Sequence, residues 1–212
     1  VLNSFFTEEL INQKKLHNKF DIIFAANVIC HIPNMLSLFK CVEKSLKQDG
    51  FFIFEEPYLG AMLEKTSYDQ IYDEHFYMFS ANSITSILDK FNLELVSAER
   101  ISTHGGSMRY YVKKTKSFKI SKQLKQVLRY EKDLKISKIK TIKKFVANCI
   151  NSKKRILKIM NEIIAKDEDI YGYGATSKST TIINYCNISN NHLDCIYDTT
   201  PIKQGKFSPG AH

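Results

Sequence analysis

The sequence predicts an α/β protein built from parts of two Rossmann-like sheets. Between residues 20 and 112, short apolar runs typical of buried strands alternate with amphipathic runs typical of helices, which is the order of a doubly wound sheet. From residue 169 a second strand, glycine turn, helix and strand follow, which is the plan of a nucleotide-binding half-fold. With 212 residues, 43% hydrophobic and 25% charged, the chain has enough apolar material for a core.

The first part of the chain alternates helices and strands. The strands at 20–25 and 51–54 are nearly continuous apolar runs, which indicates burial on both faces. Polar residues follow these two strands, at 27–31 and 55–58, and ligands of such sheets bind beyond the carboxyl ends of the strands. The expected elements are helix 8–16, strand 20–25, helix 34–46, strand 51–54, helix 80–91 and strands 93–98 and 108–112.

A lysine-rich segment separates the two α/β parts. Residues 113–166 hold 18 Lys and Arg against 3 Asp and Glu, whereas the rest of the chain is mildly acidic. Apolar residues at helical spacing favour a pair of solvated amphipathic helices; the alternative is a nucleic-acid surface. Aromatic residues are sparse and no nucleic-acid motif accompanies the segment, so we expect no nucleic-acid partner. The expected domains are 1–115, a helical connector at 116–167, and 168–212.

The spacing of the cysteines and the hydropathy of the chain limit which cellular compartment and which binding partners the sequence predicts. The number of cysteines is odd, at five, and no pair has CxxC spacing. We therefore expect neither a disulfide framework nor a metal site built from this chain. We expect reduced thiols in a cytoplasmic protein. No run approaches the ~18 apolar residues of a membrane span, so no membrane partner is expected.

The densest constellation of chemical groups is Tyr72-Asp73-Glu74-His75. A histidine beside carboxylates is suited to general base catalysis, because its ordinary pKa of about 6.5 lies near working pH. The alternative is a polar loop with an incidental histidine. His31 follows the first strand and is expected either to face a ligand at the carboxyl edge of the sheet or to make a structural hydrogen bond.

Two glycine turns are candidates for phosphate binding. Gly105-Gly106-Ser107 with Arg109 offers backbone donors, a hydroxyl and a guanidinium, although a plain hairpin turn has the same spacing. Gly172-Tyr173-Gly174 with Lys178 lacks the third glycine of a dinucleotide fingerprint, but the lysine can meet a phosphate at a helix start.

Taken together, these motifs resemble the sugar C-methyltransferases that methylate C3 of nucleotide-linked 4-keto deoxyhexoses. The stretch from Tyr72 to His75 is the most specific match, and the similarity runs over nearly the whole chain. The matching stretches are residues 27–33, 54–60, 65–76, 104–109, 172–175 and 203–206.

The resemblance implies an architecture. Family members carry an N-terminal zinc-binding domain, a central S-adenosylmethionine domain and a C-terminal Rossmann-like domain. The chain would then hold the C-terminal half of a class I methyltransferase sheet, a helical connector and a truncated second Rossmann-like domain. The zinc cysteines and the glycine loop for the cofactor, S-adenosyl-L-methionine, would lie upstream of Val1. The alternatives are a fragment without activity that keeps the fold and an O-methyltransferase on the same scaffold.

The resemblance also implies roles for single residues. His75 is expected as the base that removes the C3 proton of the sugar, with Glu74 and Tyr72 orienting it or holding the sugar and His31 assisting. The resulting enolate would attack the sulfonium methyl group. Ala26 and Asn27 are expected to contact the cofactor, and the expected contacts to the nucleotide-sugar substrate are Tyr58, Ser107, Arg109 and Lys178.

Overall fold

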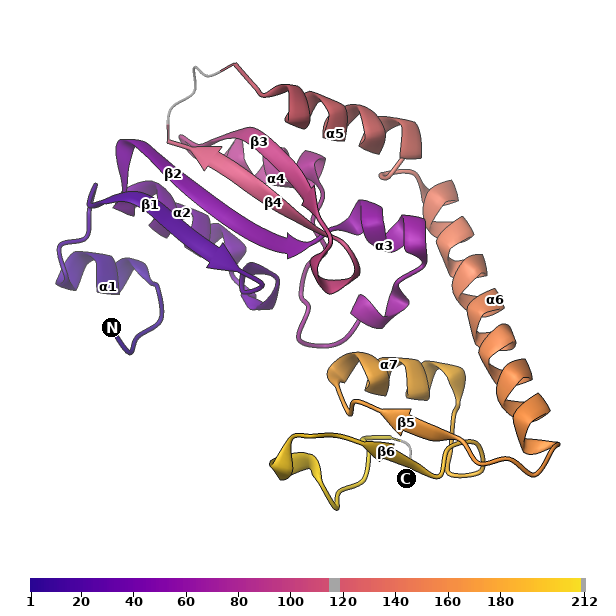
Figure 1. Cartoon of the computed structure of the whole chain (residues 1–212). Coiled ribbons are helices and arrows are strands. Elements are labelled where there is room, and N and C mark those ends of the chain that lie inside the picture. The colour runs from indigo at the N-terminus through magenta and orange to yellow at the C-terminus, as the bar shows by residue number, and fades with distance from the viewer. Residues whose placement is uncertain (115–118, 211–212) are drawn as a thin grey trace. The chain divides into compact units, whose positions relative to one another are not determined.

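The computed structural model describes residues 1–114 and 119–210, which form two compact units (Figure 1). The first unit comprises residues 1–65 and 74–138, and the second comprises residues 66–73 and those from 139 onward. The segment expected as a connector, 116–167, contributes one helix to each unit.

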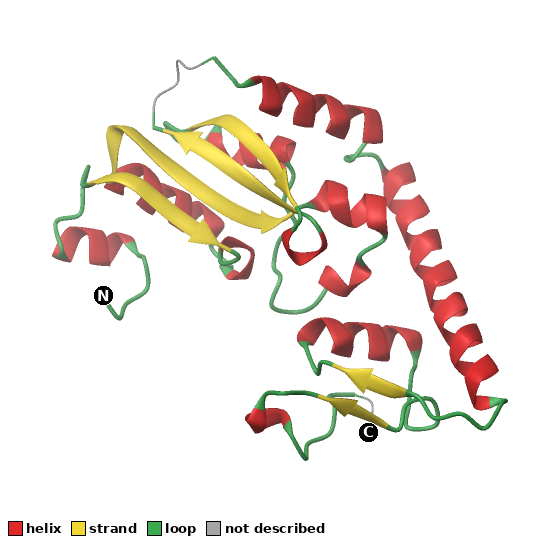
Figure 2. Cartoon of the chain, in the orientation of Figure 1, coloured by secondary structure: helices red, strands yellow, loops and turns green. Residues whose placement is uncertain are grey.

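The first unit contains a four-stranded mixed sheet with helices packed beside it, which confirms the predicted α/β class (Figure 2). Its strands are β1 (Phe20–Ala26), β2 (Leu46–Pro57), β3 (Glu94–Ile101) and β4 (Ser107–Lys113), in the order β1-β2-β4-β3. β1 and β2 are parallel, whereas β4 is antiparallel to β2 and to β3. The carboxyl ends of β1 and β2 therefore lie at the same edge.

β2 is longer than the apolar run that predicted it. The run at 51–54 is its middle, and the strand continues to Pro57 because Glu55 and Glu56 pair with Arg109 and Met108 of β4. The expected polar break after residue 54 is thus part of the strand. Side chains alternate across a strand, so Glu56 lies on the same face as Phe52 and Phe54.

In the described residues of this unit, five α-helices accompany the sheet: α1 (Glu8–Gln13), α2 (Met35–Ser45), α3 (Leu59–Lys65), α4 (Ala81–Leu88) and α5 (Lys122–Leu134). Polar side chains cap four of them, since Thr7, Asn34, Ser80 and Ser121 each accept a backbone N–H of the first turn. The sequence did not predict α3. Short 3₁₀ helices lie at Ile29–His31 and Thr103–Gly105.

The core packs α2, α4 and α5 against one face of the sheet. Phe52, Phe54 and Tyr110 are stacked on that face, and Phe39 of α2 packs edge-on against both phenylalanines. The prediction that the strand at 20–25 is buried on both faces is wrong, because the opposite face of the edge strand β1 is open: Ile22 and Phe24 are 60% and 59% exposed. An apolar groove of about 360 Å³ runs along this edge.

The second unit contains α6 (Ile139–Ile164), β5 (Tyr171–Tyr173), α7 (Ser177–Cys186) and β6 (Cys195–Tyr197), with 3₁₀ helices at Tyr68–Gln70 and Pro201–Lys203. β5 and β6 are parallel, as the expected strand–helix–strand plan requires. Met160, Ile183, Cys186 and Ile188 form its core. The short segment 66–73 belongs here because the Tyr68 hydroxyl contacts Ser152 Oγ and Cys186 Sγ, at 3.4 and 3.6 Å.

Within the described residues, no helix combines the length and apolar character needed to cross a lipid bilayer.

Candidate active site

A buried carboxylate shapes the turn that follows β1. Asn27 has a φ of 53°, which bends the chain out of the strand, and Val28 leads into the 3₁₀ helix that contains His31. Glu56, at the end of β2, is fully buried, and its Oε1 accepts the N–H groups of Val28 and Ile29 at 3.0 and 2.6 Å. A carboxylate bonded to two backbone donors holds them strongly, so Glu56 fixes the start of the His31 turn.

His31 and His75, far apart in the sequence, lie together at this edge. Their ring centroids are 5.0 Å apart, with the rings tilted by 57°. His31 Nδ1 lies 2.9 Å from the backbone oxygen of Glu74, and the Phe76 N–H donates to the backbone oxygen of Cys30 at 2.9 Å. The two loops are thus joined by hydrogen bonds on both sides of His75.

The bond to Glu74 fixes the proton on His31. A carbonyl oxygen can only accept, so Nδ1 must be the donor. In the neutral ring, Nε2 then carries the lone pair and is an acceptor. His31 therefore makes the structural hydrogen bond that was one of the two roles expected for it. This bond orients the ring beside His75.

Cys30 lies beside the two histidines, on the buried side of this group. Its side chain is buried, and burial, followed by the neighbouring Glu56 carboxylate, raises the pKa of its thiol well above the ordinary value. Without a bound cation the thiol is therefore protonated.

The remaining expected catalytic and cofactor residues are placed as follows. Ala26 and Asn27 end β1 and begin its turn, beside His31 in the chain. The Asn27 Oδ1 is buried and has no hydrogen-bond partner in the described part of the chain. The Glu74 side chain is exposed, and only its backbone oxygen contacts His31. Tyr72 belongs to the second unit.

Two of the expected substrate contacts lie inside the protein. Tyr58 is 1% exposed and its hydroxyl donates to Glu131 at 3.1 Å; burial, followed by that carboxylate, raises the pKa of the phenol. Ser107 is also 1% exposed and donates to the Thr103 backbone oxygen at 3.1 Å. In this structure each hydroxyl holds a neighbouring element, and a contact from either one to the substrate stays a prediction.

Arg109 and its glycine turn also make internal contacts. The guanidinium pairs with Glu55 at 2.6 Å and Glu99 at 3.7 Å across the sheet. Gly106 has a φ of 133°, and a Cβ there would lie 2.6 Å from Ala61 Cβ. The turn therefore needs glycine in order to pack closely on α3, which accounts for it without a phosphate.

Sequence reasoning missed two buried acids, Glu56 and Glu131. For Glu56 a signal existed: it follows Phe52 and Phe54 at a spacing of two residues, which puts it on their buried face. Glu131 sits in the lysine-rich segment, and its signal is helical spacing: it follows Leu124 by seven residues and Val127 by four, which puts it on their buried face of α5.

Comparisons with known proteins identify the family of this chain. A family model for the C-terminal domain of C-methyltransferases matches residues 102–212. This chain belongs to the C-methyltransferase family. A methyltransferase-domain model matches residues 2–98. C-methyltransferase NovU from Streptomyces niveus is 26% identical over 196 residues, which are 92% of this chain and 47% of NovU. The chain thus spans about half the length of this relative.

Among solved structures, this C-methyltransferase chain is similar to an inferred methyltransferase from Bacillus halodurans C-125. The TM-score is 0.38 and the identity 11%, over 47% of this chain and 66% of that one.

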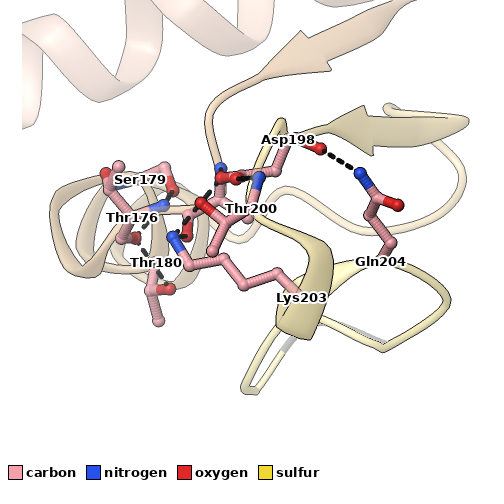
Figure 3. A network of polar contacts seen from close by, with 8 residues as sticks. Thr176, Ser179, Thr180, Asp198, Thr200, Lys203 and Gln204 are labelled. Carbon is pink, nitrogen blue, oxygen red and sulfur yellow. Dashed lines mark hydrogen bonds and ion pairs between the residues drawn. The ribbon is translucent and has the colours of Figure 1, made fainter.

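In the second unit of this C-methyltransferase chain, Asp198 organises the glycine turn (Figure 3). Its carboxylate accepts the N–H groups of Ala175 and Thr200, both at 2.8 Å, and pairs with Lys203 at 3.4 Å. These contacts, the one to Thr200 foremost, lower the pKa of Asp198. Lys178 lies in the first turn of α7, which Thr176 and Ser179 begin with a capping box. The backbone N–H groups of Ala175, Thr176 and Ser179 are thus already bonded within the chain.

Proposed function

We propose that this protein transfers a methyl group from S-adenosyl-L-methionine to C3 of a nucleotide-linked 4-keto deoxysugar, with His75 as the base. The paired histidines at the carboxyl edge of β1 and β2 carry this proposal, because they supply a base and an oriented neighbour at the edge where such sheets bind ligands. The similarity to C-methyltransferase NovU supports transfer to carbon.

The turn after β1 fits a polar cofactor. Asn27 Oδ1 is buried without a partner among the described residues, and such an atom is costly unless a ligand or water satisfies it. We propose that Asn27 and Ala26 contact the cofactor there. When bound, S-adenosyl-L-methionine supplies an electrophilic methyl group on a sulfonium sulfur.

His75 would remove the proton on C3 of the sugar, whose acidity comes from the neighbouring ketone. The C–H bond would break, its proton would go to the imidazole, and the electron pair would form an enolate. C3 of the enolate would then take up the methyl group, and the electron pair of the broken S–CH3 bond would stay on the sulfur as a neutral thioether. His31, with its lone pair on Nε2, can accept a hydrogen bond from protonated His75 and so stabilise the charge that develops on it. A positioned base of this kind contributes about 10²–10⁴-fold in rate.

Substrate contacts by Tyr72, the Glu74 side chain, Arg109 and Lys178 remain predictions. Of these, Arg109 would have to give up its two carboxylate partners to bind a phosphate. Contacts by Tyr58 and Ser107 also remain predictions, and each buried hydroxyl would have to give up its internal partner to meet the substrate.

The test is exchange of the sugar C3 hydrogen with deuterated water, catalysed by the chain and followed by NMR. We expect His75→Ala to reduce exchange by about 10²-fold or more. His17→Ala is the control, since His17 is exposed and bonds only locally to Asn12. Exchange near the wild-type rate in His75→Ala would remove His75 from the role, and no exchange by the wild-type chain would favour the inactive-fragment alternative.

A further inference from the structure

Three soft donor atoms meet at the candidate active site, although they are not close enough in sequence to form a metal motif. The Cys30 thiol and one ring nitrogen each from His31 and His75 lie within 4.8 Å of one another. Cys30 is buried, whereas the two histidines are partly exposed, so the cluster opens outward from the core.

We propose that Cys30, His31 and His75 form a binding site for a borderline-soft transition metal ion, with Zn²⁺ as its representative. Thiolate and imidazole are the ligands that such ions prefer, and three protein ligands leave a fourth position for water. This goes beyond the proposed function and does not depend on it, because metal binding requires neither cofactor nor sugar.

The orientation of His31 matches that of a metal-bound histidine. Ligating histidines usually donate their second ring N–H to a carboxylate or backbone carbonyl, which fixes the tautomer and raises the basicity of the ligating nitrogen. His31 makes this bond through Nδ1 to the Glu74 backbone oxygen at 2.9 Å, which leaves Nε2 as the ligand atom.

The distances require only small movements. Ligand atoms around a tetrahedral Zn²⁺ are roughly 3.5 Å apart, given metal–ligand bonds of about 2.0–2.3 Å. Donors within 4.8 Å of one another therefore have to approach by about 1.3 Å at most. Both imidazoles are partly exposed, so small side-chain rotations can supply this approach.

Charge at the site favours a dication. Glu56 is fully buried, and its Oε2 has no hydrogen-bond partner among the described residues. On binding, the Cys30 S–H bond breaks, the proton passes to solvent and a metal–sulfur bond forms. The thiolate and the Glu56 carboxylate then balance the two positive charges, so the buried negative charge gains a counter-ion.

A metal bound here would occupy the lone pair of His75. The site would therefore be inhibitory toward any reaction in which His75 acts as a base, and chelators would restore that reaction.

The experiment is titration of the 212-residue chain with Zn²⁺ by calorimetry and with Co²⁺ by absorption spectroscopy, with Mg²⁺ as the hard-ion control. We expect one Zn²⁺ per chain, a thiolate-to-cobalt charge-transfer band, and no binding of Mg²⁺. His31→Ala and His75→Ala should each weaken Zn²⁺ binding at least about 10-fold. Cys30→Ser should abolish the charge-transfer band.

The matched controls are His17→Ala and Cys41→Ser, which replace an exposed histidine and a buried cysteine of the same unit outside the cluster. Both should bind Zn²⁺ like the wild type, and far-UV circular dichroism verifies that each variant is folded. Absence of stoichiometric binding, or equal weakening in the cluster and control variants, overturns the proposal. Either result leaves the C3 exchange test unaffected, since that reaction is measured with a chelator present.

Discussion

His31 Nδ1 lies 2.9 Å from the backbone oxygen of Glu74, so the histidine after β1 is hydrogen-bonded to the residue that precedes His75. The bond joins two loops and orients the imidazole of His31 beside that of His75. It separates two roles of His31, since Nδ1 holds the loop and Nε2 is left for chemistry.

His31→Asn and His31→Ala distinguish these two roles. The Asn amide can still donate to the Glu74 oxygen but has no counterpart of Nε2, whereas Ala has neither group. We expect Asn to preserve slow amide exchange at Phe76, whose N–H bonds to Cys30, and Ala to accelerate it. Both variants should lower C3 exchange of the sugar about 10-fold or more. A wild-type rate in His31→Asn would show that Nε2 has no part in the reaction.

Glu56→Gln should destabilise the protein much more than Glu55→Gln, although the residues are adjacent. Glu56 is fully buried and bonds to two backbone N–H groups, so replacing its charge should cost about 1–3 kcal/mol of unfolding free energy. Glu55 makes a partly exposed pair with Arg109, worth about 1 kcal/mol or less. Urea unfolding at pH 7 measures both. Equal losses would show that Glu56 does not fix the His31 turn.

Glu131 is expected to be the main stabilising residue of the lysine-rich segment. It is fully buried in α5 and accepts from the N–H groups of Ala81 and Asn82, the Asn82 amide and the Tyr58 hydroxyl. Glu131→Gln leaves some of these donors unpaired and should cost roughly 2–5 kcal/mol. Asp133→Asn, two residues on and exposed, is the control and should change stability by less than about 0.5 kcal/mol. Thermal unfolding of the two variants measures both losses of stability, and losses of equal size would contradict this role of Glu131.

Asp198 should make the second unit sensitive to acid. Its pKa is lowered in the folded chain by the Thr200 and Ala175 N–H groups and by Lys203. A depressed carboxyl pKa stabilises the fold above the unfolded value, about 4, and this stability is lost as pH falls below it. Asp198→Asn should therefore flatten the pH dependence of unfolding between about pH 4 and 2 and weaken the unit at neutral pH. Tyrosine fluorescence during acid titration monitors this; an unchanged acid transition would contradict it.

Truncation should destabilise the protein much more at Phe54 than at Phe24. Phe54 is fully buried between Phe52 and Tyr110, so Phe54→Ala should cost about 3–5 kcal/mol. Phe24 is 59% exposed on the open face of β1, so Phe24→Ala should cost less than about 1 kcal/mol in the 212-residue chain. Denaturant unfolding compares them. A large loss for Phe24 would mean that this face is covered in solution.

Most elements of both units, though not α3, could be predicted from the sequence. The four strands of the first sheet, the helices at 35–45 and 81–88, and the parallel pair of the second unit lie where apolar spacing predicted them. This is because local spacing encodes which face of an element is buried. The end of β2 was misplaced because Glu55 and Glu56 read as a polar break, whereas pairing with β4 continues the strand through them.

The sequence by itself determined the α/β class and the elements, together with the resemblance that singled out His31 and His75. Only the tertiary structure decided which polar groups are available for chemistry. It brought His31 beside His75 and placed the buried Cys30 next to the buried Glu56. It also buried Tyr58 and Ser107 in the core. The reason is physical: a residue's local pattern specifies its own element, whereas burial and hydrogen-bond partners depend on distant segments that fold against it.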